Sequence, residues 1–183
     1  MFGVSSKDSD FDKIFYEKRY LIEKIARKYS KSQSMLEDLV QQVFLTIYLN
    51  LGKVLSAENK DGYIHTLAVN EIMGYFRKKK HNIQTVAFTD EMESVISAVE
   101  KNSEQDIYLE QISENLISLL STLPDKRRNV VILRILEEKT FREISEILLI
   151  SEVSARNLFS MGIKNVRQLM EKYKEKSYAF NRR

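Results

Sequence analysis

The sequence predicts an all-α protein made of two small helical domains joined by an acidic linker. One proline and five glycines among 183 residues favour long helices over a turn-rich β protein. Apolar residues recur at helical spacings of three and four through most of the chain. The formal charge is +4 over residues 1–80, −7 over residues 81–122 and +6 over residues 123–183. Two basic modules around an acidic connector suggest two contacts with a polyanion, although the same charges would also suit ordinary solvated helix surfaces.

The composition excludes several other classes of protein. Hydrophobic residues make up 43% and charged residues 30% of the chain, so the chain is globular rather than disordered. It has no cysteine and only two histidines, His65 and His81, so we expect no disulfide, metal centre or cofactor. No apolar run approaches the roughly 20 residues of a membrane span, and the N-terminus lacks a signal-peptide pattern. We therefore expect a cytosolic protein, and no catalytic constellation indicates an enzyme.

The first two helices are predicted from their apolar periodicity. One covers Ser9 to Tyr29, and a second follows a possible capping box of Ser34 and Glu37. The apolar period of the second helix runs without a miss to Leu51 and is the strongest in the chain. Its exposed side begins with four polar residues: Glu37, Asp38, Gln41 and Gln42.

A third helix is predicted from Gly62 to about Lys79, after a loop over residues 51–61. Its core face holds apolar residues, and a second face is lined by Thr66, Asn70, Met73 and Arg77. The helix ends in a basic run from Arg77 to Lys80. Cations stabilise the C-terminus of a helix through its dipole, but four adjacent bases exceed that need, so we favour phosphate contact.

Residues 81–103 have weak periodicity and several acids, and we interpret them as a linker. A helix is expected to resume near Asp106, with Tyr108, Ile112, Leu116, Leu119 and Leu120 pointing inward. Pro124 is well placed to start the next helix, which should run from Asp125 to Glu137. At the other end of the chain, the segment after Tyr173 is expected to fray.

The segment from Thr140 to Val166 has the pattern of a helix-turn-helix. Thr140 and Glu143 form a capping box at its start, and Ser151 offers a second N-cap a few residues later. The second helix leaves a set of polar side chains off its apolar stripe: Ser154, Arg156, Asn157, Ser160 and Lys164. Such side chains can bond to base edges and phosphates. An ordinary antiparallel helix pair has the same local pattern, so this segment alone leaves both interpretations open.

Three stretches together resemble a bacterial RNA polymerase sigma factor of the extracytoplasmic-function group, in the sigma-70 family. EDLVQQVFLTIY (Glu37–Tyr48) resembles the region 2 helix that binds core polymerase. YIHTLAVNEIMGYFRKKK (Tyr63–Lys80) is similar to the helix that reads the −10 element, and residues 123–159 resemble region 4, which reads the −35 element. The resemblance implies a region 2-like domain over residues 1–80, a linker over 81–105, a region 4-like domain over 106–175 and a basic tail over 176–183.

The resemblance also implies partners and site residues. The partners are core RNA polymerase, through its clamp coiled coil and flap, and promoter DNA, with an anti-sigma factor as a further possibility, all in the bacterial cytoplasm. The residues implied for core binding are Glu37, Asp38, Gln41 and Gln42. Those implied for the −10 element are Asn59, Lys60, Tyr63, Thr66, Asn70, Arg77, Lys78, Lys79 and Lys80. Those implied for the −35 element are Arg142, Ser154, Arg156, Asn157, Ser160 and Lys164.

The sequence departs from the family pattern at several positions. Gln42 stands where the family usually has Glu, and Leu149 occupies a turn that usually holds Gly, which puts the backbone of that turn in question. Leu158, Met161 and Ile163 stand at recognition-helix positions where the family often has a base, so we expect the −35 contact to rest on fewer cations.

The family pattern gives the acidic linker a possible role. In the family the linker threads the polymerase channel that RNA later occupies, so an acidic strand could mimic RNA there; an ordinary solvated linker is the equal alternative. Two other classes of function compete with a sigma factor. One is a non-sigma helix-turn-helix regulator with an N-terminal sensing or dimerisation domain, which would bind a palindromic operator alone. The other is a helical interaction protein with no role on DNA.

Overall fold

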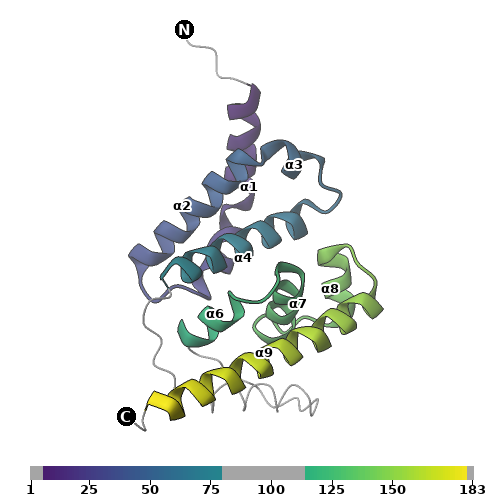
Figure 1. Cartoon of the computed structure of the whole chain (residues 1–183). Coiled ribbons are helices and arrows are strands. Elements are labelled where there is room, and N and C mark those ends of the chain that lie inside the picture. The colour runs from purple at the N-terminus through teal and green to yellow at the C-terminus, as the bar shows by residue number, and fades with distance from the viewer. Residues whose placement is uncertain (1–5, 80–113, 181–183) are drawn as a thin grey trace. The chain divides into compact units, whose positions relative to one another are not determined.

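The computed structural model describes residues 6–79 and 114–180, and every regular element within those ranges is an α-helix (Figure 1). The chain divides into two compact units, Met1–Tyr75 and Phe76–Arg183. The predicted all-α fold with two helical domains is therefore confirmed. The first four helices are α1 (Ser6–Arg27), α2 (Gln33–Leu49), α3 (Leu51–Ser56) and α4 (Lys60–Lys79). The later ones are α6 (Glu114–Leu120), α7 (Asp125–Ile135), α8 (Phe141–Leu148) and α9 (Glu152–Phe180).

The N-terminal unit is held by an apolar core and by an aromatic cluster between α1 and α2. The ring centroids of Phe15 and Phe44 lie 4.5 Å apart, and Phe11 meets Tyr48 edge-on at 5.1 Å. Polar contacts tie α4 to both partners: Lys18 pairs with Asp61 at 2.7 Å, and the Thr46 hydroxyl donates to Glu71 at 3.1 Å. The buried core residues of this unit are Ile14, Ile22, Ile25, Ala26, Tyr29, Leu36, Leu39, Val43, Phe44, Ile47, Leu51, Val54, Ile64, Ala68, Val69, Ile72 and Met73.

Two expectations for this unit are wrong. The N-cap of α2 is Ser32, whose backbone is extended and whose Oγ accepts from the Met35 N–H at 3.2 Å, whereas Ser34 lies inside the helix. The expected loop over residues 51–61 contains α3, because Leu51 and Val54 are both buried and sit one helical turn apart. Met73, which lies on the second face of α4 with Thr66 and Asn70, is fully buried.

In the C-terminal unit, α9 is the helix against which α6, α7 and α8 all pack. The centre of the unit is a cluster of Val130, Leu133, Ile144 and Ala155. The Arg127 guanidinium donates to the Asn165 side chain at 2.7 Å and ties α7 to α9. The tail that we expected to fray after Tyr173 continues as helix to Phe180, since residues 173–180 contain no glycine or proline to end it.

A buried arginine fixes the corner between α6 and α7. The Arg128 side chain is fully buried; it donates to the Asp125 carboxylate at 2.6 Å and to the Leu123 carbonyl at 3.1 Å. Burial lowers the pKa of Arg128, and the nearby Asp125 carboxylate opposes that shift. Pro124 serves as the N-cap of α7 rather than as its first helical residue. Asp106, Tyr108, Ile112 and the expected linker lie outside the described residues.

Helices α7 and α9 lie close together at Gly162. A Cβ atom at Gly162 would lie 2.5 Å from Cγ2 of Val131 and 3.5 Å from the Arg127 carbonyl oxygen. We therefore expect Gly162→Ala to lower the free energy of unfolding by about 1–3 kcal/mol, the usual cost of overpacking. The measurement is chemical denaturation of the whole protein followed by circular dichroism.

Gly74→Ala is the matched control, because a Cβ at Gly74 in α4 would meet nothing within 4 Å. The control should leave stability unchanged or raise it by up to about 1 kcal/mol, since alanine is the better helix former. Equal effects of the two substitutions would contradict the close approach of α9 to α7.

Candidate nucleic-acid interface

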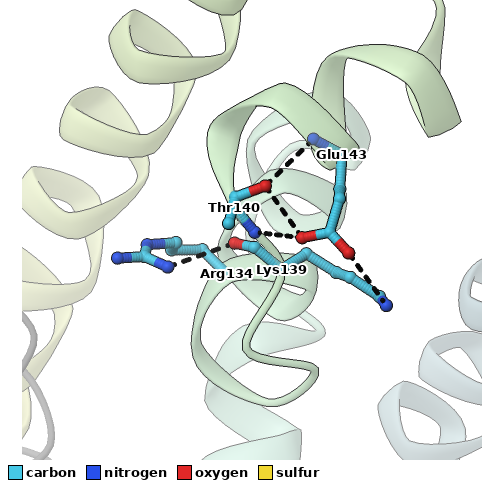
Figure 2. A network of polar contacts seen from close by, with 4 residues as sticks. All are labelled: Arg134, Lys139, Thr140 and Glu143. Carbon is cyan, nitrogen blue, oxygen red and sulfur yellow. Dashed lines mark hydrogen bonds and ion pairs between the residues drawn. The ribbon is translucent and has the colours of Figure 1, made fainter. Parts of the chain in front are cut away.

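The N-terminus of α8 is fixed by a complete capping box (Figure 2). The Thr140 hydroxyl oxygen accepts from the Glu143 N–H at 3.2 Å, and the Glu143 carboxylate accepts from the Thr140 N–H at 2.8 Å. Around the box, Lys139 lies 3.5 Å from the Glu143 carboxylate, and Arg134 donates to the Lys139 carbonyl at 3.2 Å. The capping box predicted for Thr140 and Glu143 is confirmed.

The turn between α8 and α9 keeps a left-handed backbone without glycine. Leu149 has φ 52° and ψ 50°, a conformation that costs a side-chain-bearing residue roughly 1–2 kcal/mol. The N–H groups of Leu149 and Ile150 both donate to the Ser145 carbonyl, and Ile150 packs against the core cluster. The two hydrogen bonds and the packing of Ile150 thus fix the turn. The backbone keeps the left-handed conformation that glycine would favour, although Leu149 stands in its place. Ser151 then caps α9 by accepting from the Ser154 N–H at 3.1 Å, as predicted.

The polar side chains predicted for the −35 site are all exposed, five of them on α9 and Arg142 on α8, and three of the six have partners inside the protein. The Arg156 guanidinium lies 4.7 Å from the centroid of the Phe141 ring and 3.4 Å from the Glu152 carboxylate. The Ser154 hydroxyl accepts from Ser151 at 2.9 Å. On α8, Arg142 pairs with Glu146 at 3.3 Å. The other three predicted residues, all exposed, are Asn157, Ser160 and Lys164.

Two of the three apolar positions noted on the recognition helix face the protein rather than solvent. Ile163 is buried, and Leu158 is half-buried against the core cluster. Their apolar side chains contribute to packing, so a cation at either position would point into the protein and not toward DNA. Met161 is the exception, at 49% exposure. Sequence reasoning also missed Val153, which is 67% exposed in the first turn of α9; its signal was an apolar residue off the buried stripe.

The candidate −10 surface lies along α4. The helical period places Tyr63, Thr66, Asn70 and Arg77 along one side of the helix; the first three are half-buried and Arg77 is exposed. The Thr66 hydroxyl donates to the Gly62 carbonyl within the helix at 2.9 Å.

The two ends of α4 hold the other candidates. At its start, the Asn59 side-chain oxygen accepts from the Gly62 N–H at 2.9 Å and so caps the helix, and Lys60 is the exposed first residue. Lys78 is exposed near the other end, whereas the side chain of Lys79 and the whole of Lys80 lie outside what the structure describes.

The candidate polymerase-binding surface lies on α2. All four predicted residues are exposed, and Glu37 accepts a hydrogen bond from the Gln33 amide at 2.9 Å. The structure adds Leu45 and Leu49, which are 52% and 69% exposed. They follow Asp38 at offsets of seven and eleven residues, and therefore lie on the same side of the helix. The sequence pattern did not single them out, because α2 already had an unbroken apolar stripe for its core.

Within the described ranges, no group of His, Asp and Glu side chains could hold a metal ion. None of the helices described there is long and apolar enough to cross a membrane.

Comparison with known proteins identifies both halves of the chain. A family model described as "Sigma-70 region 2" matches residues 15–82, and one described as "Sigma-70, region 4" matches residues 113–166. RNA polymerase sigma factor SigZ of Bacillus subtilis is 26% identical over 139 residues, which cover 76% of this chain and 74% of that protein. ECF RNA polymerase sigma factor SigM of the same organism is 26% identical over 141 residues, covering 76% and 82%.

A further relative of the same kind is ECF RNA polymerase sigma factor SigW of Bacillus subtilis. It is 27% identical over 137 residues, which cover 72% of this chain and 73% of that protein. A region 2 followed by a region 4, each matched to a helical part of the fold, defines a transcription initiation factor that works with RNA polymerase. The chain belongs to the extracytoplasmic-function group of the sigma-70 family. Its function is promoter recognition and transcription initiation, and sigma factors are themselves non-enzymatic.

The capping box makes the stability of the helix-turn-helix depend on pH. The backbone N–H and hydroxyl of Thr140 lower the pKa of Glu143. A carboxyl whose pKa is lowered on folding contributes stability above its unfolded pKa and loses it as the pH falls. We expect Glu143→Gln, which keeps a capping side chain, to reduce the loss of stability as the pH falls below 4.5, the ordinary value for Glu143. Thermal unfolding at a series of pH values measures this.

Thr140→Ala tests the same pair from the other side. It should lower stability at neutral pH by about 0.5–2 kcal/mol, the usual effect of losing an N-cap, and should also reduce the loss of stability at acidic pH. A pH dependence that is unchanged in both variants would show that this carboxylate has no such role.

Proposed function

We propose that this sigma factor binds core RNA polymerase through the exposed side of α2 and reads promoter DNA through α4 and the helix-turn-helix. This division of roles among α2, α4 and the helix-turn-helix is supported by the order of the two family matches along the chain. It is also supported by the exposed polar residues on each of these helices. The protein would then act in the bacterial cytoplasm, where its polymerase is. A non-sigma regulator does not account for the region 2 match.

The polymerase contact is assigned to the side of α2 that holds Asp38, Leu45 and Leu49. Two exposed leucines beside a carboxylate and the amides of Gln41 and Gln42 form a mixed surface. Such a surface suits a partner helix, because the leucines supply apolar area and the polar groups fix the register. The resemblance suggests the clamp coiled coil as that partner, and the polymerase flap as the partner of region 4.

The −10 contact is assigned to Tyr63, Thr66 and Asn70, with Asn59 and Lys60 before them. An aromatic ring can stack on an unpaired base, and an amide can bond to a base edge. Arg77 and Lys78 would hold phosphates, joined by Lys79 and Lys80. Asn59 already caps α4, so we assign it mainly the positioning of the loop before the helix.

The −35 contact is assigned to the exposed side of α9, with its N-terminal turn in the major groove. Asn157, Ser160 and Lys164 supply donors and acceptors there, and Arg142 of α8 lies on the exposed side of its own helix. Ser154 and Arg156 complete the set, each already held by a neighbour in the protein.

The expected linker over residues 81–105 falls outside the described residues, and its proposed place in the polymerase channel follows from the acidic charge of this part of the chain and from the path of the linker in the family.

The polymerase contact is tested by reversing one charge. Asp38→Arg should weaken binding to core polymerase by about 2 kcal/mol or more, roughly thirtyfold, which is the range of an interface hot spot. The helical circular dichroism should stay native, because Asp38 is exposed. The measurement is the affinity of the purified protein for core polymerase.

Glu17→Arg on the exposed side of α1 is the matched control, with the same change of charge. It should bind core polymerase as the wild type does. If Asp38→Arg and Glu17→Arg assemble holoenzyme equally well, the assignment of the α2 surface is wrong.

The two DNA interfaces should differ in their dependence on salt. Arg77→Ala with Lys78→Ala should weaken all promoters alike and reduce the slope of log affinity against log salt by about 0.7–0.9 for each phosphate that is no longer neutralised. Arg156→Ala should change that slope by about one unit at most and relax the preference at one position of the −35 element. The measurement is holoenzyme affinity for single-base −35 variants at several salt concentrations. If Arg156→Ala weakens every variant equally, Arg156 binds a phosphate and not a base.

A further inference from the structure

The exposed large apolar side chains described in the C-terminal unit all belong to the helix-turn-helix. Among the described residues of that unit they are Leu149, Val153 and Met161, at 56%, 67% and 49% exposure. An exposed large apolar side chain on a surface that is otherwise polar can mark a place where a partner binds. Val153 is the most exposed of the three, and it belongs to the first turn of α9.

The position of Val153 on α9 is defined by the helical period. Val153, Asn157, Ser160 and Lys164 follow each other at offsets of four, three and four residues, so they form one line along the helix. The opposite side of α9 is the buried one, with Ala155, Gly162 and Val166. Val153 is therefore the N-terminal end of the line that points away from the protein core.

This line of four has a chemistry that suits DNA better than a protein surface. It holds an amide, a hydroxyl and an ammonium group beside the valine, and no carboxylate. The carboxylate nearest in sequence, Glu152, lies 3.4 Å from the Arg156 guanidinium, which offsets its charge. The N-terminal residues of a recognition helix are those that reach base edges in the major groove.

We infer that Val153 reads a thymine in the −35 element through the C5-methyl group of that base. In the major groove, thymine is the base that presents an apolar methyl group, which apolar side chains contact. Valine suits this contact because its branched Cβ restricts χ1, so little side-chain freedom is lost on binding. The inference rests on the proposed function, in which α9 enters the major groove, and adds the identity of a base to that contact.

The test removes the methyl group alone. A −35 sequence is first selected by holoenzyme from a promoter library randomised at that element. Each thymine of the selected element, on either strand, is then replaced singly by deoxyuridine, which lacks only the methyl. At one position the wild-type holoenzyme should lose about fourfold in affinity, as expected for about 0.8 kcal/mol of apolar burial. Holoenzyme with Val153→Ala should bind the thymine and deoxyuridine forms of that position equally.

Met161→Ala is the matched control. Met161 is also exposed on α9 but lies eight residues further along the helix, and its removal should leave the methyl dependence as in the wild type. Circular dichroism and core polymerase affinity of Val153→Ala should match the wild type, since the side chain contributes little to the core.

Each other result would overturn the inference. Equal methyl dependence in the wild type and in Val153→Ala, after a clear −35 selection, overturns it while leaving the proposed function intact. A loss of core polymerase affinity in Val153→Ala, with methyl dependence unchanged, would make Val153 a protein contact instead. If no −35 sequence is enriched in the selection, the proposed reading by α9 fails and the inference fails with it.

Discussion

The structure of the C-terminal unit depends on how closely α9 can approach α7. Gly162 makes that approach possible, because a Cβ atom there would lie 2.5 Å from a methyl group of Val131. Helices α6, α7 and α8 all pack on α9, so the depth of this one contact sets the position of the recognition helix in its unit. The proposed recognition surface and the core are thus two sides of the same 29-residue helix, and the packing of α6, α7 and α8 gives that surface a rigid support.

Much of the fold could be predicted from local sequence patterns. The predictions that were wrong concern features that a local pattern cannot decide. The capping box of Thr140 and Glu143 was predictable because both partners lie within one turn of helix. The choice between Ser32 and Ser34 was not, since two serines so close fit the same motif and the backbone decides between them. The short helix α3 was missed because its burial of Leu51 and Val54 is tertiary, and glycine nearby pointed to a loop.

The sequence predicted which kinds of site the chain has better than it predicted which residues face the partner. Family likeness placed Leu158 and Ile163 among DNA-facing positions, yet the packing of α9 turns both toward the protein. The exposed apolar residues Leu45, Leu49 and Val153 were overlooked for the opposite reason. A sequence pattern counts an apolar residue as core by default, and only the completed fold shows which of them has no core to enter.

The partners of Arg156 bear on how DNA can be read by α9. Its guanidinium already lies over the Phe141 ring and beside the Glu152 carboxylate. To form a bidentate pair with guanine it would have to give up at least part of these contacts, and Glu152 would then face DNA phosphates without its partner. Asn157 and Val153 carry no such cost, because both are exposed and neither is charged. If α9 enters the major groove as proposed, base reading by Arg156 therefore costs it part of its contacts with Phe141 and Glu152, whereas base reading by Val153 and Asn157 costs no such contact.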